Sequence, residues 1–171
     1  LAGFLVELAD AVHSLDPDHP FLYREVAEFN FDELRMALKE RIAQDKDERS
    51  WFVLGLTVYD TGITGERFEG VLNRWLSSGW DRPALIAEFG VLGLSRSDRI
   101  TATPNLLNKL KKYKENFLGA LAYVWSTNGP EAVDAELGFV NNDGEAVDNR
   151  LSLIGRMWLE EAQAEQIREG T

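Results

Sequence analysis

The sequence lacks cysteine altogether and has only two histidines among its 171 residues. Without a thiol, the chain can form no disulfide framework, no thiolate metal site and no cysteine nucleophile. The histidines, His13 and His19, lie on either side of an Asp16-Pro17 break and lack the close spacing of paired metal ligands. We therefore expect no metal site and no cofactor.

Positive charge and long apolar runs are also scarce. The chain carries 18 Lys and Arg residues against 29 Asp and Glu, a formal net charge of -11. An excess of negative charge repels a phosphate backbone, so nucleic acid is not an expected partner. No segment approaches the roughly 20 apolar residues that cross a bilayer, so no membrane association is expected. The cellular compartment stays open.

Phosphate-binding motifs are missing as well. Neither a Gly-x-Gly-x-x-Gly segment nor a Walker motif occurs in the sequence, which argues against a nucleotide-binding function. The chain starts at Leu1, without an initiator methionine and without the basic start of a secretory signal. We expect it to be the middle or the end of a longer polypeptide.

The chain does contain enough apolar residues for a sizeable core, at 44% hydrophobic and 11% aromatic content. Strand patterns begin near residues 21, 52, 83 and 119, at intervals of about 31 to 36 residues, the length of a β/α unit. Helical patterns precede the first strand and follow each strand. This alternation predicts an α/β fold with a parallel sheet.

Several local expectations follow from the pattern. The run 51–59 is too apolar for an exposed strand and predicts one buried on both faces. Thr103-Pro104 predicts a helix start, with proline at the first helical position. Residues 119–125 are interpreted as another buried strand, and Asn142-Asp143-Gly144 predicts a tight turn. A last helix is expected from about residue 151.

Two architectures fit this pattern: an open doubly wound sheet, or half of a (β/α)8 barrel. Both bind ligands at the C-terminal ends of their parallel strands. The residues expected there are Glu25 or Glu28, Tyr59 with Asp60, Glu88, and Trp125 with Ser126 and Asn128. A carboxylate that attacks an anomeric carbon, a phenol that orients it and an indole that stacks on a pyranose ring together suit sugar chemistry.

Five segments then resemble landmarks of clan A retaining glycoside hydrolases, most like family 2 and family 5, which include β-galactosidases, β-glucuronidases, mannanases and cellulases. Their order matches the last four strands of that catalytic barrel. The segments are Leu15-Asp-Pro-Asp-His-Pro20, Leu54-Gly-Leu-Thr-Val-Tyr59, Pro83-Ala-Leu-Ile-Ala-Glu-Phe-Gly90, Ala122-Tyr-Val-Trp125 and Gly138-Phe-Val-Asn-Asn-Asp-Gly144.

The resemblance implies that residues 1–171 form the C-terminal half, strands 5 to 8, of a TIM barrel whose N-terminal half is absent. It also implies that Glu88 is the nucleophile, that Tyr59 contacts it and that Trp125 stacks on a carbohydrate substrate. The family's acid/base residue is the Glu of an Asn-Glu pair, and no Asn-Glu dipeptide occurs in this sequence. The chain is therefore expected to need the missing half-barrel or another copy as its partner.

Other interpretations remain open. Glu88 could be a structural carboxylate that caps a nearby backbone or pairs with Arg24 or Arg82, and Tyr59 and Trp125 could simply fill the core. The whole chain could be a non-catalytic relative that binds sugars or supports assembly. A third possibility is a doubly wound α/β enzyme with an unrelated substrate.

Overall fold

The strands of the computed structural model form one four-stranded sheet. The model describes residues 2–26, 31–43, 50–80, 84–124, 126–128 and 137–169. All four strands are parallel and lie in the order β1-β2-β3-β4. A doubly wound sheet reverses its strand order at a switch point, and the described strands show no such reversal. The fold is α/β and agrees with half of a TIM barrel, which confirms the predicted architecture. The strands are β1 Phe21–Val26, β2 Phe52–Asp60, β3 Ala84–Val91 and β4 Ala120–Ala122.

Strand β2 is the most deeply buried part of the sheet. Every residue from Phe52 to Val58 is buried, which confirms the prediction of a strand covered on both faces. Leu54 and Leu56 have no exposed surface, and burial of such a side chain contributes roughly 1.5–3 kcal/mol of transfer free energy. The pairing of β2 with β1 places Arg24 beside Gly55.

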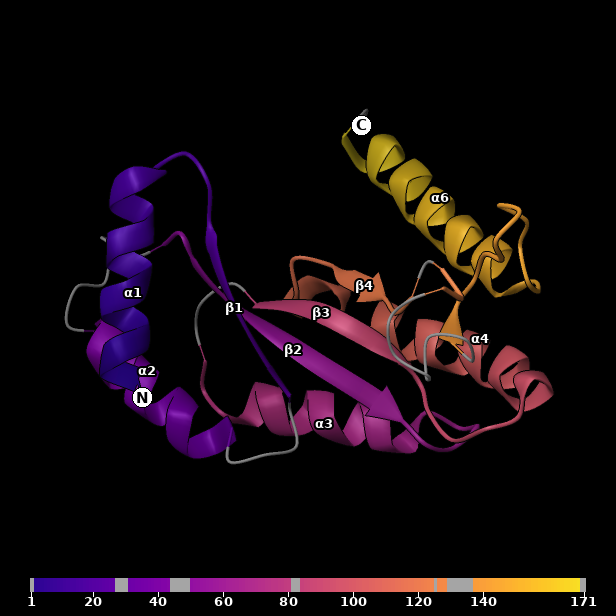
Figure 1. The fold of residues 1–171 in the computed structure, drawn as a ribbon, viewed down its shortest axis with the longest axis horizontal. Helices are drawn as coiled ribbons and strands as arrows, with labels where there is room; N and C mark the ends of the chain where they lie inside the picture. Colours follow the sequence, from indigo (N-terminus) through magenta and orange to yellow (C-terminus); the bar gives the residue numbers. More distant parts are fainter. Residues whose placement is uncertain are drawn as a thin grey trace. The chain divides into compact units, whose positions relative to one another are not determined.

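The described residues fall into two compact units. The first consists of Leu1–Val58, Glu69–Phe89 and Tyr113–Leu121. In this unit, helices α1 (Ala2–Leu15) and α2 (Phe31–Ala43) lie side by side (Figure 1). Most of α3 (Glu66–Ser77) belongs to it too, and α3 buries Leu72 and Trp75. The short 3-10 helix η1 (Lys114–Asn116) precedes β4.

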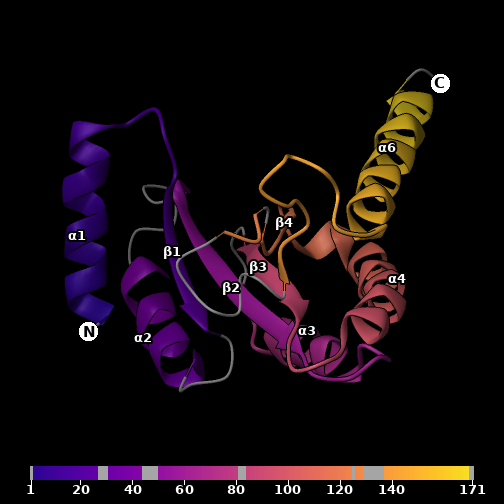
Figure 2. The ribbon, with the colours of Figure 1, turned by 45° about the vertical axis from the view of Figure 1, so that its right-hand side comes forward.

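The second unit consists of Tyr59–Phe68, Gly90–Lys112 and Ala122–Thr171. Its two long helices, α4 (Arg96–Lys112) and α6 (Arg150–Glu169), adjoin one another (Figure 2). Lys111 Nζ lies 3.0 Å from Glu160 Oε2 and joins the two helices by an exposed ion pair. Among the helices of the described residues, none is both long and apolar enough to span a membrane.

The predicted start of α4 was wrong. The helix begins at Arg96, so Pro104 lies inside it rather than at its first position. Ser95 caps this helix, because its Oγ accepts a hydrogen bond from the backbone N–H of Asp98 at 3.2 Å and donates one to the Asp98 carboxylate at 2.7 Å. Ser95 is therefore the N-cap residue of α4, and the Asp98 carboxylate in the first turn holds its hydroxyl in place. It gives a stronger start than Thr103, whose hydroxyl donates instead to the Arg99 carbonyl oxygen.

Two expectations about strand ends also need correction. Strand β3 does not end at Glu88 but continues to Val91, because Phe89 and Val91 are both buried. Strand β4 covers Ala120–Ala122, not residues 119–125, and is half-buried. It is an edge strand of the described sheet, and Leu121 is 56% exposed. An edge strand lacks a neighbour on one side, so its side chains are less covered.

The tight turn after β4 was predicted correctly. The backbone N–H of Gly144 donates to the carbonyl oxygen of Asn141 at 3.1 Å, and the Asn141 side chain accepts from the N–H groups of Asp143 and Glu145. Gly144 has a φ of 79°, which favours glycine. The turn reverses the chain so that Val140 and Ala146 form an antiparallel bridge.

Candidate active site at the strand ends

Glu88 lies near the C-terminal end of β3, where the alternation of buried side chains changes phase. Ala84 and Ile86 are buried before it, and Phe89 and Val91 after it. Because of this change in the alternation, the Glu88 side chain does not point toward the buried face of β3, and its charge is not enclosed in the core. Its side chain is 12% exposed, which makes it accessible but largely removed from solvent.

Arg24 forms an ion pair with Glu88. Its terminal Nη1 donates to Glu88 Oε2, and the Arg24 side chain is 56% exposed. The two residues are on β1 and β3, with β2 between them. One of the two structural roles considered for Glu88, pairing with Arg24, is therefore present, and a reactive carboxylate can form the same ion pair. Arg82, the other predicted partner, lies outside the described residues.

Two more polar side chains of the first unit lie near the strand ends. Thr57 is 6% exposed, and within the described part of the chain its Oγ1 has no hydrogen-bond partner. Glu25 also has a buried carboxylate oxygen without a partner in the described structure, and burial raises the pKa of this carboxyl group. The pKa of Tyr23 is raised by burial and by the charge of Glu25. Glu28 falls outside the described residues.

Tyr59 belongs to the second unit, together with Gly90 and Tyr123. The rings of Tyr59 and Tyr123 meet edge to face, with centroids 6.3 Å apart and planes at 86°. Gly90 leaves room for the phenol ring, since a Cβ there would lie 3.0 Å from Tyr59 Cε1. An aromatic pair of this geometry contributes about 0.5–1.5 kcal/mol beyond its buried area and fixes the direction of the ring.

Asp60 has a structural role, although it was among the strand-end candidates. It is 2% exposed, and its carboxylate accepts hydrogen bonds from the backbone N–H groups of Gly62 at 2.7 Å and Phe68 at 2.8 Å. Phe68 lies in the first turn of α3, where N–H groups have no partner within the helix. Asp60 therefore links the end of β2 to the start of α3.

Trp125, the predicted sugar-stacking residue, lies outside the described residues. The chain on either side of it is closely packed against residues 138–140. Thr127 N donates to the Val140 carbonyl oxygen at 3.0 Å, and Phe139 N donates to the Val124 carbonyl oxygen at 3.0 Å. A Cβ at Gly138 would lie 2.5 Å from Thr127 N, so only glycine fits this backbone contact. Asn128 N donates to Ser126 Oγ within the same turn.

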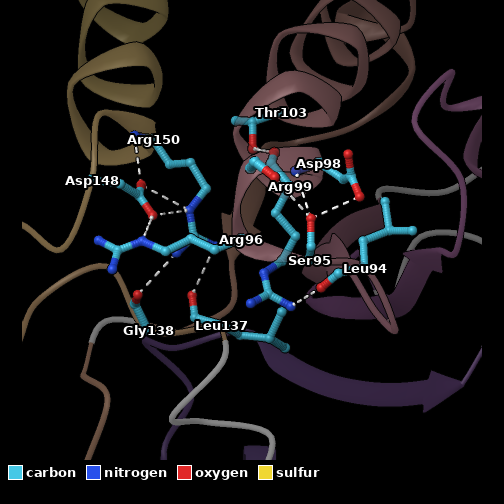
Figure 3. Close-up of polar contacts among 11 residues, drawn as sticks. Leu94, Ser95, Arg96, Asp98, Arg99, Thr103, Leu137, Gly138, Asp148 and Arg150 are labelled. Carbon is cyan, nitrogen blue, oxygen red and sulfur yellow. Dashed lines mark hydrogen bonds and ion pairs between the residues drawn. The ribbon is translucent and has the colours of Figure 1, made fainter.

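A cluster of arginines and one aspartate holds residues 137–138 in place (Figure 3). Arg150 is 3% exposed and donates to the carbonyl oxygens of Leu137 at 3.3 Å and Gly138 at 3.1 Å. Asp148 accepts from Arg150 Nε at 2.9 Å and from Arg96 Nε at 3.3 Å. Burial alone would raise the pKa of Asp148, but the hydrogen bonds from Arg150 and the charges of Arg150 and Arg96 together lower it.

The comparisons with known proteins come from structure rather than sequence. No family model matches the chain, and no curated protein sequence matches it. A GH128 (subgroup VI) exo-beta-1,3-glucanase from Aureobasidium namibiae matches 86% of the chain with a TM-score of 0.66 and 16% identity. The Bacteroides uniformis beta-glucuronidase matches 84% of it with a TM-score of 0.60 and 12% identity. The chain spans 57% of the first protein and 18% of the second. At this identity the likeness shows a shared fold, that of TIM-barrel proteins.

Three residues of this region carried no functional prediction. Gly55 and Thr57 were predicted as parts of a buried strand and of the landmark segment Leu54 to Tyr59, without roles of their own, although a glycine inside such a strand signals a close approach of neighbours. Tyr123 was read as part of a landmark segment, not as a partner of Tyr59. Within the described ranges, no group of three or more His, Asp or Glu side chains is placed to hold a metal ion.

Proposed function

We propose that this chain is part of the catalytic domain of a retaining glycoside hydrolase that cleaves O-glycosidic bonds of a β-linked oligo- or polysaccharide. Glu88 is the nucleophile, Tyr59 orients it and Trp125 stacks on the sugar. The observation that carries the proposal is the position of Glu88: a partly exposed carboxylate near the C-terminal end of a parallel strand. Two glycoside hydrolases share this fold, and the Pro83 to Gly90 segment resembles the nucleophile strand of families 2 and 5.

A retaining mechanism needs a second carboxyl group about 5–5.5 Å from the nucleophile to act as acid and base. The Asn-Glu pair that supplies it in the family does not occur in this sequence. We propose that another part of the active protein supplies it, either further β/α units or a second copy of the chain. Residues 1–171 alone would then bind sugar without turnover.

The nucleophile can be tested in the natural full-length polypeptide with a 2-deoxy-2-fluoro glycoside, which traps the covalent intermediate of retaining enzymes. Mass spectrometry of the digest should find the adduct on Glu88, and Glu88→Gln should lower kcat by at least roughly 10³-fold and abolish labelling. The matched control is Glu160→Gln, which removes another carboxylate that pairs with a cation. Labelling that persists in Glu88→Gln would exclude Glu88 as the nucleophile.

The second candidate function is a non-catalytic relative that binds sugars or supports assembly. The Arg24–Glu88 ion pair favours this second function, because a carboxylate that pairs with an arginine can have a purely structural role. Calorimetry with β-linked oligosaccharides distinguishes the two. A binder would show saturable heat and no hydrolysis in the full-length polypeptide, whereas an enzyme would release reducing ends.

A further inference from the structure

Arg24 reaches Glu88 across an intervening strand. Arg24 is on β1, Glu88 is on β3, and β2 lies between them. Neighbouring strands are about 4.8 Å apart, so the side chains must cover about two strand spacings between them. Such a pairing is easiest where the middle strand has no side chain at the point that the arginine crosses.

Gly55 is such a position on β2. It is the residue of β2 that pairs with Arg24 in the sheet register. A Cβ at position 55 would lie 3.1 Å from Ala87 Cβ, 3.1 Å from Leu22 Cδ1 and 3.3 Å from the Cα of Arg24. A side chain at position 55 would therefore be crowded by β1 and β3, and glycine leaves the surface of β2 open beside Arg24.

The two members of the pair differ in exposure. The Glu88 side chain is 12% exposed and that of Arg24 is 56% exposed. A carboxylate that has lost most of its hydration is stabilised by a cationic donor. Arg24 keeps contact with solvent, and a guanidinium has five N–H groups, of which the terminal Nη1 is used here.

We propose that Arg24 is a positioning residue that holds one oxygen of the Glu88 carboxylate and stabilises its negative charge when the glycosyl-enzyme breaks down. This inference rests on the proposed function. In the first step, a Glu88 oxygen bonds to the anomeric carbon and loses its charge. The glycosidic C–O bond breaks with its electron pair on the leaving oxygen, which takes a proton from the second carboxyl group. In the second step, water attacks the anomeric carbon and gives its proton to that group, and the C–O bond to Glu88 breaks with its electron pair returning to the carboxylate.

Arg24 therefore acts more strongly on the second step, in which the carboxylate charge is restored. Its loss should slow hydrolysis of the glycosyl-enzyme more than its formation. A residue that only supported the fold would lower both rates by the same factor. The distinguishing quantity is the lifetime of the covalent intermediate, not the overall activity.

The test uses the natural full-length polypeptide trapped with the 2-fluoro glycoside, freed of excess reagent and followed as it regains activity. In Arg24→Gln the half-life for reactivation should lengthen at least roughly tenfold, because a charged donor to the leaving carboxylate is gone. Arg24→Lys, which keeps the charge, should lie between Arg24→Gln and the unaltered protein. The control Arg156→Gln, an arginine on α6 that donates to the Ser152 carbonyl oxygen, should reactivate at the unaltered rate.

Each outcome decides between the two proposals. An adduct on Glu88 with unchanged reactivation in both Arg24 variants would overturn the role of Arg24 and leave the glycosidase function standing. No adduct on Glu88 in the unaltered protein would overturn the function and the role of Arg24 together. If thermal melting shows that Arg24→Gln is unfolded, Arg24→Lys decides, and reactivation at the unaltered rate counts against the proposal.

Discussion

Thr57 is a buried hydroxyl whose cost to the fold can be measured. It is 6% exposed on β2, two residues after Gly55 and therefore on the same face. Its Oγ1 has no partner in the part of the chain that the structure describes. A buried hydroxyl without a hydrogen bond costs about 1–3 kcal/mol, in contrast to the apolar residues around it.

Thr57→Val should therefore stabilise the protein, by on the order of 1 kcal/mol, because valine has the same shape without the unpaired hydroxyl. Urea denaturation followed by circular dichroism measures the change. The control is Thr101→Val, since the Thr101 hydroxyl is exposed and donates to the Ser97 carbonyl oxygen at 3.1 Å. A loss of stability in Thr57→Val would show that the hydroxyl has a partner in the folded protein.

At the residue scale, the sequence predicted positions better than roles. Glu88 lies on β3 as expected but three residues before the strand ends at Val91, and whether it is reactive stays a prediction. Asp60 ends β2 as expected, yet its carboxylate also binds the N–H of Phe68 in the first turn of α3, a partner that no local sequence pattern connects to it. The Arg24 contact with Glu88 was one of two open alternatives, since a pairing over 64 residues of chain depends on sheet register.

At the element scale, helices and strands were predicted where apolar periodicity is strong. β1 and the buried β2 follow the expected pattern closely, whereas α4 starts well before the predicted Pro104. The N-cap residue Ser95, with Asp98 three positions later, is the local signal that marks this start. Proline at a first helical position is a competing signal, and it pointed to Pro104. β4 is shorter than predicted because the apolar run continues beyond the part of the chain that pairs with β3.

Asp148 binds Arg150, which holds residues 137–138 to the start of α6. The stability that this arrangement contributes should depend on pH through the Asp148 carboxyl group. Its pKa is lowered in the folded protein, so the stability it contributes is present above the ordinary carboxyl pKa of about 3.9 and is lost as the pH falls through the lowered value. Asp148→Asn leaves the buried Arg150 without its carboxylate and should cost about 3–5 kcal/mol at pH 7. The difference from the unaltered chain should shrink at pH 3.

Urea denaturation at the two pH values checks this expectation. Asp143→Asn is the matched control, because Asp143 is an exposed carboxyl in the turn of residues 141–144, which precedes Asp148. An Asp148→Asn variant that was equally destabilised at pH 7 and at pH 3 would show that geometry, not charge, accounts for the contribution of Asp148.

At the scale of the whole molecule, apolar side chains of α1 remain exposed. On α1, Ala2, Leu5, Val6 and Ala9 are buried, but the other apolar positions are not. The exposed residues lie on one side of the helix at a spacing of four, four and three residues. They are Phe4 at 63%, Leu8 at 41%, Val12 at 41% and Leu15 at 88% exposed. Exposed apolar stripes of this kind favour association.

The isolated chain should therefore bind a hydrophobic dye and associate in solution, giving a mass above 19.3 kDa in light scattering. A Leu8→Glu and Val12→Lys double variant should bind less dye and shift toward the monomer, because charges on the stripe oppose its burial. Ile63→Glu, at an exposed residue in the loop after β2, serves as control. A monomer that binds no dye would contradict the expected need for a partner.

The strands follow one another in the sheet in the same order as in the chain. This order affects how such a protein can change during evolution. Each strand of the described sheet pairs only with its neighbours along the chain. A β/α unit gained or lost at either end of a gene would therefore add or remove one edge of the sheet and leave the inner pairings intact. Adding a whole β/α unit does not change the order of the existing strands. Duplication and fusion of short gene segments can therefore build larger sheets of this kind step by step.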